Sequence, residues 1–172
     1  MNNIFVFLRN AFEIQDEDFN NPTRHVVLPS LTQEAIEKIG TDNRLIMIKK
    51  SVFDKNRKHH NELTPDDSRK VLNAALTSAD LIINDKPSNK PNYWIVVNLD
   101  KNENAVLNVD IDSAKQFIEV VGWRKVRDRS IEQIKNRAIR EGGQVLMTQK
   151  GAAGLSALTD NSVSGSKDTD NI

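Results

Sequence analysis

Two adjacent histidines, His59 and His60, close a short basic stretch and are the side chains of this sequence best suited to chemistry. Residues 48–60 place five cations around one acid, Asp54, and these cations are Lys49, Lys50, Lys55, Arg57 and Lys58. A group that titrates near neutral pH, with positive charge beside it, is what cleavage of a phosphodiester without a metal requires. The same pattern also fits the solvated basic face of a helix next to a strand, so both interpretations stay open.

The composition limits the classes of protein that this chain can belong to. A length of 172 residues fits one domain with material left over at an end. Lys plus Arg and Asp plus Glu both count 24, so the formal net charge is zero and any surface for nucleic acid must be local. Cysteine is absent, which excludes disulfides, thiol catalysis and Cys-ligated metals and fits a reducing cytosol. Three histidines without an H-x-x-x-H spacing predict neither a metal site nor a cofactor.

The distribution of apolar residues predicts a cytoplasmic protein without a membrane partner. No apolar run approaches the ~20 residues that a membrane span requires. The first residues, MNNIFVFLRN, lack the basic start and the long apolar run of a signal peptide.

Hydrophobic periodicity and helix-start signals predict an α+β fold. We expect strands in residues 25–29, 44–49, 80–85, 93–99, 105–111, 117–126 and 144–148. Helices should begin at Ser30 or Thr32, at Ser51, at Thr64, where proline and two acids follow the cap residue, and at Ser130. Short connections between the later strands indicate an antiparallel meander. We therefore expect N-terminal helices packed on a C-terminal antiparallel sheet.

The two ends differ in composition from the middle of the chain. Residues 1–24 carry a short apolar segment followed at once by acids, which predicts an N-terminal arm. Residues 151–172 are mainly small and polar and cannot bury enough surface to offset their ordering entropy, which predicts a disordered tail. The expected domain therefore comprises residues 25–150.

The order of these elements resembles the phage nucleases of the barnase–EndoU–colicin E5/D–RelE (BECR) type. Such nucleases are found behind the head-morphogenesis protein of Mu-like phages or inside polyvalent proteins of phages and conjugative elements. The resemblance spans residues 43–149 and is carried by RKHH at 57–60, LT at 63–64, ADLII at 79–83, NYW at 92–94, IEVV at 118–121 and RAIREGGQ at 137–144. It implies a metal-independent ribonuclease without a cofactor, in the host bacterial cytosol or associated with the virion. The partners that it implies are RNA and a cognate immunity protein or a phage structural protein.

The resemblance also assigns candidate catalytic residues. In this class of fold a base takes the proton of the RNA 2′-hydroxyl, cations stabilise the charge at phosphorus, and an acid protonates the 5′ leaving oxygen. His59 or His60 is the candidate base or acid, and Lys50 and Arg57 are the candidate phosphate ligands. Thr148, on the last predicted strand, is similar in place to the hydroxyl residue that related sheets present to the substrate.

Further residues are candidates for substrate binding, namely Lys49, Ser51, Lys58, Tyr93, Glu119 and Arg140. Ser51 is a second candidate for the hydroxyl residue that the sheet presents to the substrate. Glu119 is either an acid–base partner or a residue that lines the opposite face of the sheet. Tyr93 and Trp94 point to opposite faces, so one of them can stack on a base, and we expect Trp94 to lie in the core.

Two other classes of function stay open. A fold of this type with a degraded site would be a catalytically inactive module that binds RNA or a protein, and a structural protein of a phage or mobile element would use its basic clusters only for docking. A second basic cluster, which contains Arg124, Lys125, Arg127 and Arg129, precedes the last predicted helix. Convergence of His59, His60, Lys50, Glu119 and Thr148 on one groove of the sheet would favour the nuclease.

Overall fold

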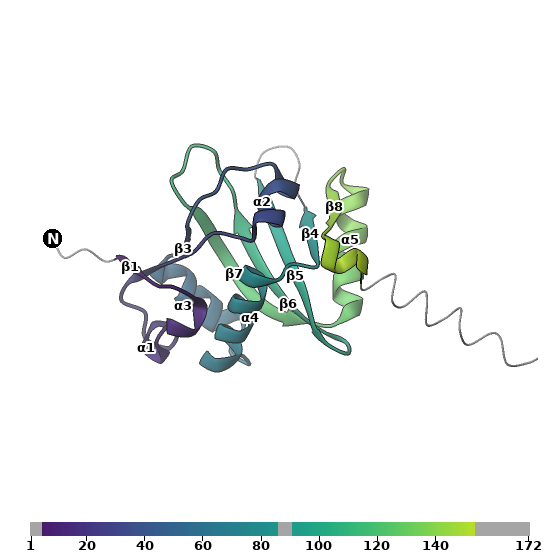
Figure 1. Cartoon of the computed structure of the whole chain (residues 1–172). Coiled ribbons are helices and arrows are strands. Elements are labelled where there is room, and N and C mark those ends of the chain that lie inside the picture. The colour runs from purple at the N-terminus through teal and green to yellow at the C-terminus, as the bar shows by residue number, and fades with distance from the viewer. Residues whose placement is uncertain (1–4, 86–90, 154–172) are drawn as a thin grey trace, which may run out of the picture.

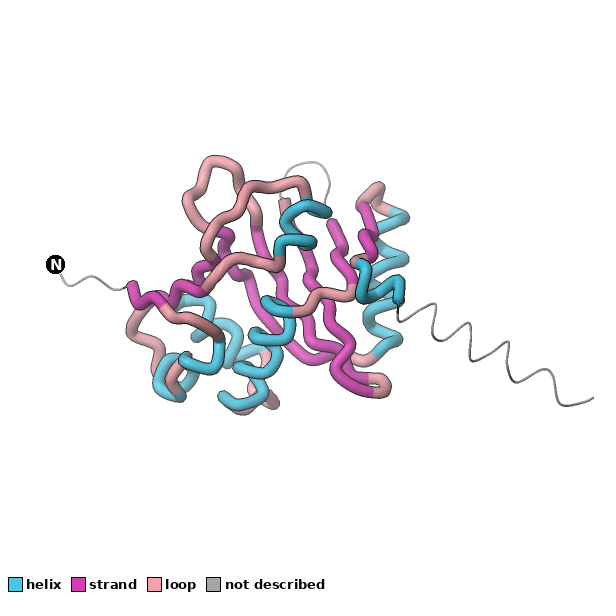
Figure 2. The backbone as a smooth tube through the Cα atoms, in the orientation of Figure 1, coloured by secondary structure: helices cyan, strands magenta, loops and turns pink. Residues whose placement is uncertain are grey.

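The computed structural model describes residues 5–85 and 91–153, which form a mixed sheet of eight strands with helices on both faces (Figures 1 and 2). The strands are β1 (Phe5–Phe7), β2 (His25–Leu28), β3 (Ile46–Ile48), β4 (Leu81–Asn84), β5 (Asn92–Asp100), β6 (Glu103–Asp110), β7 (Ile118–Val126) and β8 (Gln144–Met147). The helices are the 3-10 turn η1 (Ala11–Glu13), α1 (Asp16–Asn20), α2 (Gln33–Ile39), α3 (Lys50–His59), α4 (Pro65–Thr77) and α5 (Asp128–Arg140). The predicted α+β class is confirmed.

The sheet has the strand order β1-β2-β3-β7-β6-β5-β4-β8. The expected antiparallel sheet is found from β7 to β8, where every neighbouring pair is antiparallel. The N-terminal strands extend this same sheet, because β3 pairs in parallel with β7 through Ile46 opposite Ile118 and Met47 opposite Glu119. Strand β1 then adds in parallel to β2 at one edge.

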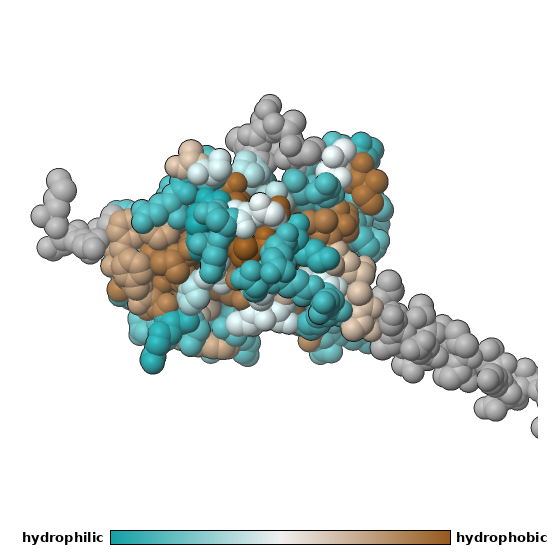
Figure 3. Space-filling model, turned by 45° about the horizontal axis from the view of Figure 1, so that its top comes forward, coloured by the Kyte–Doolittle hydropathy of each residue, from teal (hydrophilic) through white to brown (hydrophobic). Residues whose placement is uncertain are grey.

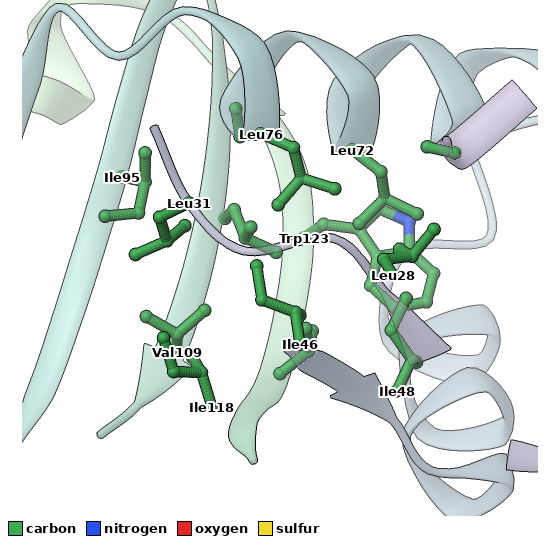
Figure 4. Close-up of a cluster of buried hydrophobic side chains, with 14 of the residues drawn as sticks. Leu28, Leu31, Ile46, Ile48, Leu72, Leu76, Ile95, Val109, Ile118 and Trp123 are labelled. Carbon is green, nitrogen blue, oxygen red and sulfur yellow. The ribbon is translucent and has the colours of Figure 1, made fainter. Parts of the chain in front are cut away.

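The main hydrophobic core lies on the face of the sheet that α2 and α4 cover (Figure 4). Leu72 and Leu76 of α4 point towards this face, and the ring of Trp123 from β7 lies in the same cluster. The indole Nε1 of Trp123 donates to Ser68 Oγ at 2.9 Å, and Phe53 of α3 meets its ring edge-on at 5.5 Å. A smaller cluster lies under α5 on the other face, where Ile131, Ile134 and Ala138 pack against β4, β5 and β6. Side chains of both faces are therefore buried, but by different helices.

The N-terminal residues, which we expected to form an arm, pack into the domain from Phe5 onward. Ala11, Ile14 and Phe19 are buried, and Arg69 of α4 donates to the carbonyl of Ile14 at 2.7 Å. Three of the acids in this segment form ion pairs, Glu13 with Arg9, Asp16 with Arg69 and Asp18 with Arg24. Phe7 and Phe12 remain exposed here, and Figure 3 shows apolar surface at the end of the molecule where the chain starts.

The predicted disordered tail, residues 151–172, falls largely outside the described residues. Residues 151–153 are helical, and a Cβ on Gly151 would lie 2.2 Å from the carbonyl oxygen of Asp80. Glycine is therefore the residue that this close approach requires. Residues 154–172 lie beyond the part of the chain that the structure describes.

Beyond the end of β3, a residue of helix α3 forms the hydrogen bond to the edge of β7. The side chain of Asn56 is buried, and its Oδ1 accepts the backbone N–H of Trp123 at 3.0 Å. At the start of α3, Lys49 provides no side-chain cap, and His25 of β2 instead accepts the backbone N–H of Lys50 on its Nδ1 at 3.0 Å. Two contacts from distant parts of the chain therefore fix the helix that carries His59 and His60.

We expect Asn56→Ala to lower the free energy of unfolding by roughly 1–3 kcal/mol, because it leaves the N–H of Trp123 without its acceptor in a buried position. Urea denaturation followed by circular dichroism measures this change. Asn61→Ala, at an exposed turn residue just after α3, is the matched control and should change the stability little. Equal stability of the two variants would contradict the role of Asn56.

Candidate functional site

A groove opens on the face of the sheet that carries α5, and residues of α3, β5, β6 and β7 line it. Its volume is about 420 Å³. Trp94, Asn108, Gly122 and Arg124 come from β5, β6 and β7, and in the register of these strands Trp94 opposes Asn108, which opposes Gly122. The remaining lining residues include Lys55, Asn56, His59, His60, Asp85, Asn92 and Asp110. We call this the sheet groove.

An irregularity in β7 decides which of its residues reach the sheet groove. Asn108 opposes Gly122, but the next residue, Val109, opposes Val120, so Val121 is an extra residue in β7. Such a β-bulge shifts the alternation of side chains by one position. Trp123 consequently joins the core beside α4, and Arg124 faces the groove.

Arg124 is a partly buried cation that forms no ion pair with any residue that the structure describes. Its guanidinium lies 5.1 Å from the centre of the Trp94 ring, an attractive cation–π arrangement. Its Nε and the Nε1 of Trp94 are buried, and within the described residues neither has a hydrogen-bond acceptor. Burial lowers the pKa of Arg124, and the charge of Arg137 lowers it further, although an arginine stays protonated at neutral pH. A buried unpaired charge is unfavourable, so this position suits an anionic ligand such as a phosphate.

Three polar side chains that line the groove are fixed by hydrogen bonds to one another. The Nδ2 of Asn92 donates to Asn108 Oδ1 and to Asp110 Oδ1, both at 2.8 Å, and Asn108 Nδ2 donates back to Asn92 at 2.9 Å. Asp85 is buried and accepts two hydrogen bonds from Arg137 of α5, at 3.2 and 2.5 Å. Asp85 is thus neutralised, and the fixed amides beside it offer hydrogen bonds to a ligand.

The two histidines project from the end of α3 and line the sheet groove. His59 is exposed, whereas His60 is partly buried with its Nδ1 3.5 Å from Glu62 Oε1. Burial lowers the pKa of His60, Glu62 opposes this, and the charge of Arg124 lowers the pKa again. The neutral imidazole therefore dominates at pH 7, which is the form that acts as a base.

The structure brings only part of the expected catalytic set together. His59 and His60 share the groove, but Lys50, Arg57 and Thr148 do not line it. Arg57 points the other way and donates to the carbonyl of Asn20 and to Asp54, so the patch of residues 49–58 is not one surface. The side chain of Lys50 is exposed at the start of α3, beside His25.

Thr148 lies at the far edge of the sheet. It is 1% exposed, and its hydroxyl donates to the carbonyl of Ala79 at 2.7 Å and accepts from the N–H of Gly151. Its hydroxyl is thus used in joining the end of β8 to β4. No sequence pattern distinguishes such a buried hydroxyl from one that faces a substrate.

The expected substrate-binding residues are dispersed as well. Lys49 and Lys115 both pair with Glu119, at 3.0 and 2.9 Å, and Lys58 pairs with Asp54 at 2.9 Å. Burial acts to raise the pKa of Glu119, but the hydrogen bonds from Lys115 and Lys49 outweigh it and lower that pKa, which makes Glu119 a poor acid. Ser51 is exposed in the first turn of α3.

The two rings of β5 lie on opposite faces of the sheet. Tyr93 packs against the main core, whereas Trp94, which we expected to lie in the core, packs against the smaller cluster under α5 and also lines the sheet groove. Alternation correctly separates the two rings, but both faces of this strand are apolar, so the sequence does not reveal which face is open.

The second basic cluster is divided between the two faces of the sheet. Arg124 faces the groove, whereas Lys125 reaches α4 and pairs with Asp67 at 3.0 Å. Arg127 and Arg129 are exposed at the start of α5. Among the described residues, Arg124 and Lys55 are the cations that line the groove, and our sequence-based assignment of roles omitted both.

Among residues 5–85 and 91–153, no three His, Asp or Glu side chains are grouped so that they could hold a metal ion. No helix in this part of the chain is long and apolar enough to cross a membrane.

The fold and the groove define an α+β domain with an open sheet face that combines two histidines, a cluster of hydrogen-bonded amides, and an arginine that has no ion pair in the described part of the chain. The chain belongs to the family described as large polyvalent protein-associated domain 13, whose model matches residues 8–138. No curated protein and no solved structure matches the chain. The family agrees with the polyvalent-protein setting that the sequence resemblance implies, and it does not specify a nuclease.

The pKa of His60 should lie below the ordinary value of about 6.5. Glu62→Gln should lower it further, since Glu62 raises it, and Glu37→Gln on α2 should leave it unchanged. NMR titration of the imidazole ring protons measures these values. Because the folded state holds this proton less tightly than the unfolded state, His60 should reduce stability as the pH falls below about 6.5. A pKa at or above the ordinary value would contradict the environment described for His60.

Proposed function

We propose that this protein is a metal-independent endoribonuclease of a phage or mobile element, of the toxin or effector type, that cleaves RNA by attack of a 2′-hydroxyl. One observation carries the proposal: His59 and His60 line the same groove as Arg124, which no described carboxylate neutralises. Membership in a polyvalent-protein family and the resemblance to BECR nucleases support it.

Each step of such a cleavage has a suitable group in the sheet groove. Neutral His60 takes the proton of the 2′-hydroxyl, and the resulting oxygen attacks the adjacent phosphorus. Arg124 binds the non-bridging oxygens and stabilises the charge that develops on them. The bond to the 5′-oxygen breaks, and protonated His59 donates a proton to that oxygen. The products are a 2′,3′-cyclic phosphate and a free 5′-hydroxyl.

The remaining lining residues provide binding rather than proton transfer. Lys55 has no ion-pair partner within the described residues and adds positive charge beside the histidines. Trp94 and the Asn92–Asn108 pair offer a ring and amide groups to a base. Lys50, Arg57 and Thr148 have no catalytic role in this mechanism, because they lie outside the groove.

We expect His60→Ala and His59→Ala each to reduce RNA cleavage by ~10²–10⁴-fold, the usual contribution of a general acid or base. Lys58→Ala is the matched control, because Lys58 lies on the same helix but pairs with Asp54, and it should cleave like the parent. The assay uses purified protein and total RNA with and without EDTA, and the 3′ ends are analysed for cyclic phosphate. On the acidic side of the pH–rate profile, the cleavage rate should rise with pH as His60 loses its proton, and this rise should lie below the ordinary pKa of histidine.

The same assay discriminates the alternative function. Absence of cleavage at every pH between about 5 and 9, together with retained RNA binding, would replace the nuclease by a catalytically inactive binding module. Cleavage that both histidine variants retain in full would also refute the proposed mechanism.

A further inference from the structure

We propose that the sheet groove continues into a second anion site, between α5 and β7, which binds a neighbouring phosphate of the same RNA strand. This inference rests on the proposed function and specifies its substrate. The substrate is single-stranded RNA of at least three nucleotides, rather than a dinucleotide or a cyclic nucleotide.

The second site is a hollow of about 540 Å³ that adjoins the sheet groove. Its lining residues are Arg124, Val126, Ser130, Gln133, Ile134, Asn136, Arg137 and Arg140. Arg124 lines both spaces, so a chain whose phosphate lies at Arg124 can continue along α5. No acidic side chain is among the described residues that line this hollow.

The sequence of α5 provides one polar stripe for this hollow. Ser130, Gln133, Arg137 and Arg140 recur at intervals of three and four residues and so lie on one side of the helix. Ile131, Ile134 and Ala138 form the apolar stripe that holds α5 on the sheet. The helix is therefore fixed by one stripe while the other presents guanidinium, amide and hydroxyl groups.

The charges in the hollow are only partly compensated. Arg137 is paired with the buried Asp85, which fixes its position and neutralises its charge. Arg140 is exposed, one turn further along α5, and like Arg124 it forms no ion pair with any described residue. Two guanidinium groups thus remain available, one shared with the sheet groove and one beyond it.

This arrangement favours a single strand of more than two nucleotides. A dinucleotide without terminal phosphates has one phosphate and can occupy only the position at Arg124, whereas a trinucleotide has a second one for Arg140. Trp94 and the Asn92–Asn108 pair on the floor suit an unstacked base, which single strands provide.

Binding of 2′-O-methyl RNA tests this site, since such RNA lacks the attacking hydroxyl. Fluorescence anisotropy would compare a dinucleotide, a trinucleotide and a hexanucleotide with the full-length protein. We expect tighter binding from the trinucleotide onward. Arg140→Gln should weaken binding of the longer strands about tenfold, the lower end for a charge-assisted hydrogen bond, and leave the dinucleotide unaffected. It should also reduce the slope of log K against log salt by about 0.7.

Lys70→Gln is the matched control, because it removes an exposed cation from α4, on the opposite face of the sheet. Binding that does not depend on length, or equal losses for Arg140→Gln and Lys70→Gln, would overturn the second site. A protein that binds with the expected length dependence but cleaves no RNA would support the site and refute the nuclease. Equal cleavage of dinucleotides and longer strands, unchanged by Arg140→Gln, would support the nuclease and overturn the site.

Discussion

The extra residue in β7, Val121, is the feature on which the groove depends. Because of this extra residue, the side chain of Trp123 points into the core. There its indole N–H donates to Ser68, and its backbone N–H donates to Asn56. The same shift turns Arg124 onto the opposite face, over the ring of Trp94. Docking of α3 and the charge in the groove are therefore consequences of one irregularity, because Trp123 and Arg124 are adjacent in a strand.

A protein with no net charge can still present local cations where a carboxylate partner is lacking, while carboxylates elsewhere neutralise neighbouring cations. Asp54 pairs with Arg57 and Lys58, and Glu119 pairs with Lys49 and Lys115. Asp85 in turn neutralises Arg137. The cations left without a carboxylate in the described part of the groove, Arg124 and Lys55, are thereby concentrated in one place. This distribution matters more for anion binding than the overall balance of charges.

The groove holds a neutral histidine beside a charged arginine, which suits acid–base chemistry. Partial burial and the charge of Arg124 keep His60 neutral, while Arg124 itself stays charged. His25 contributes from a distance, because its Nδ1 accepts the N–H of Lys50 and so fixes the start of α3. Burial lowers the pKa of His25, and the charges of Lys50 and Lys49 lower it further, which preserves the neutral form that this hydrogen bond needs.

The sequence by itself determined the local elements of this protein. The helix that begins after Thr64 has the expected cap residue, first-turn proline and acids, α3 lies where the basic stretch predicted it, and the late strands and α5 follow their apolar periodicity. These signals depend on residues a few positions apart, and they suffice for the α+β class. Tertiary structure alone decided the parallel joining of β3 to β7, the shift at Val121, and the burial of Thr148. The reason is that these features depend on contacts between residues far apart in the chain, such as Asn56 with Trp123, which periodicity and capping do not encode.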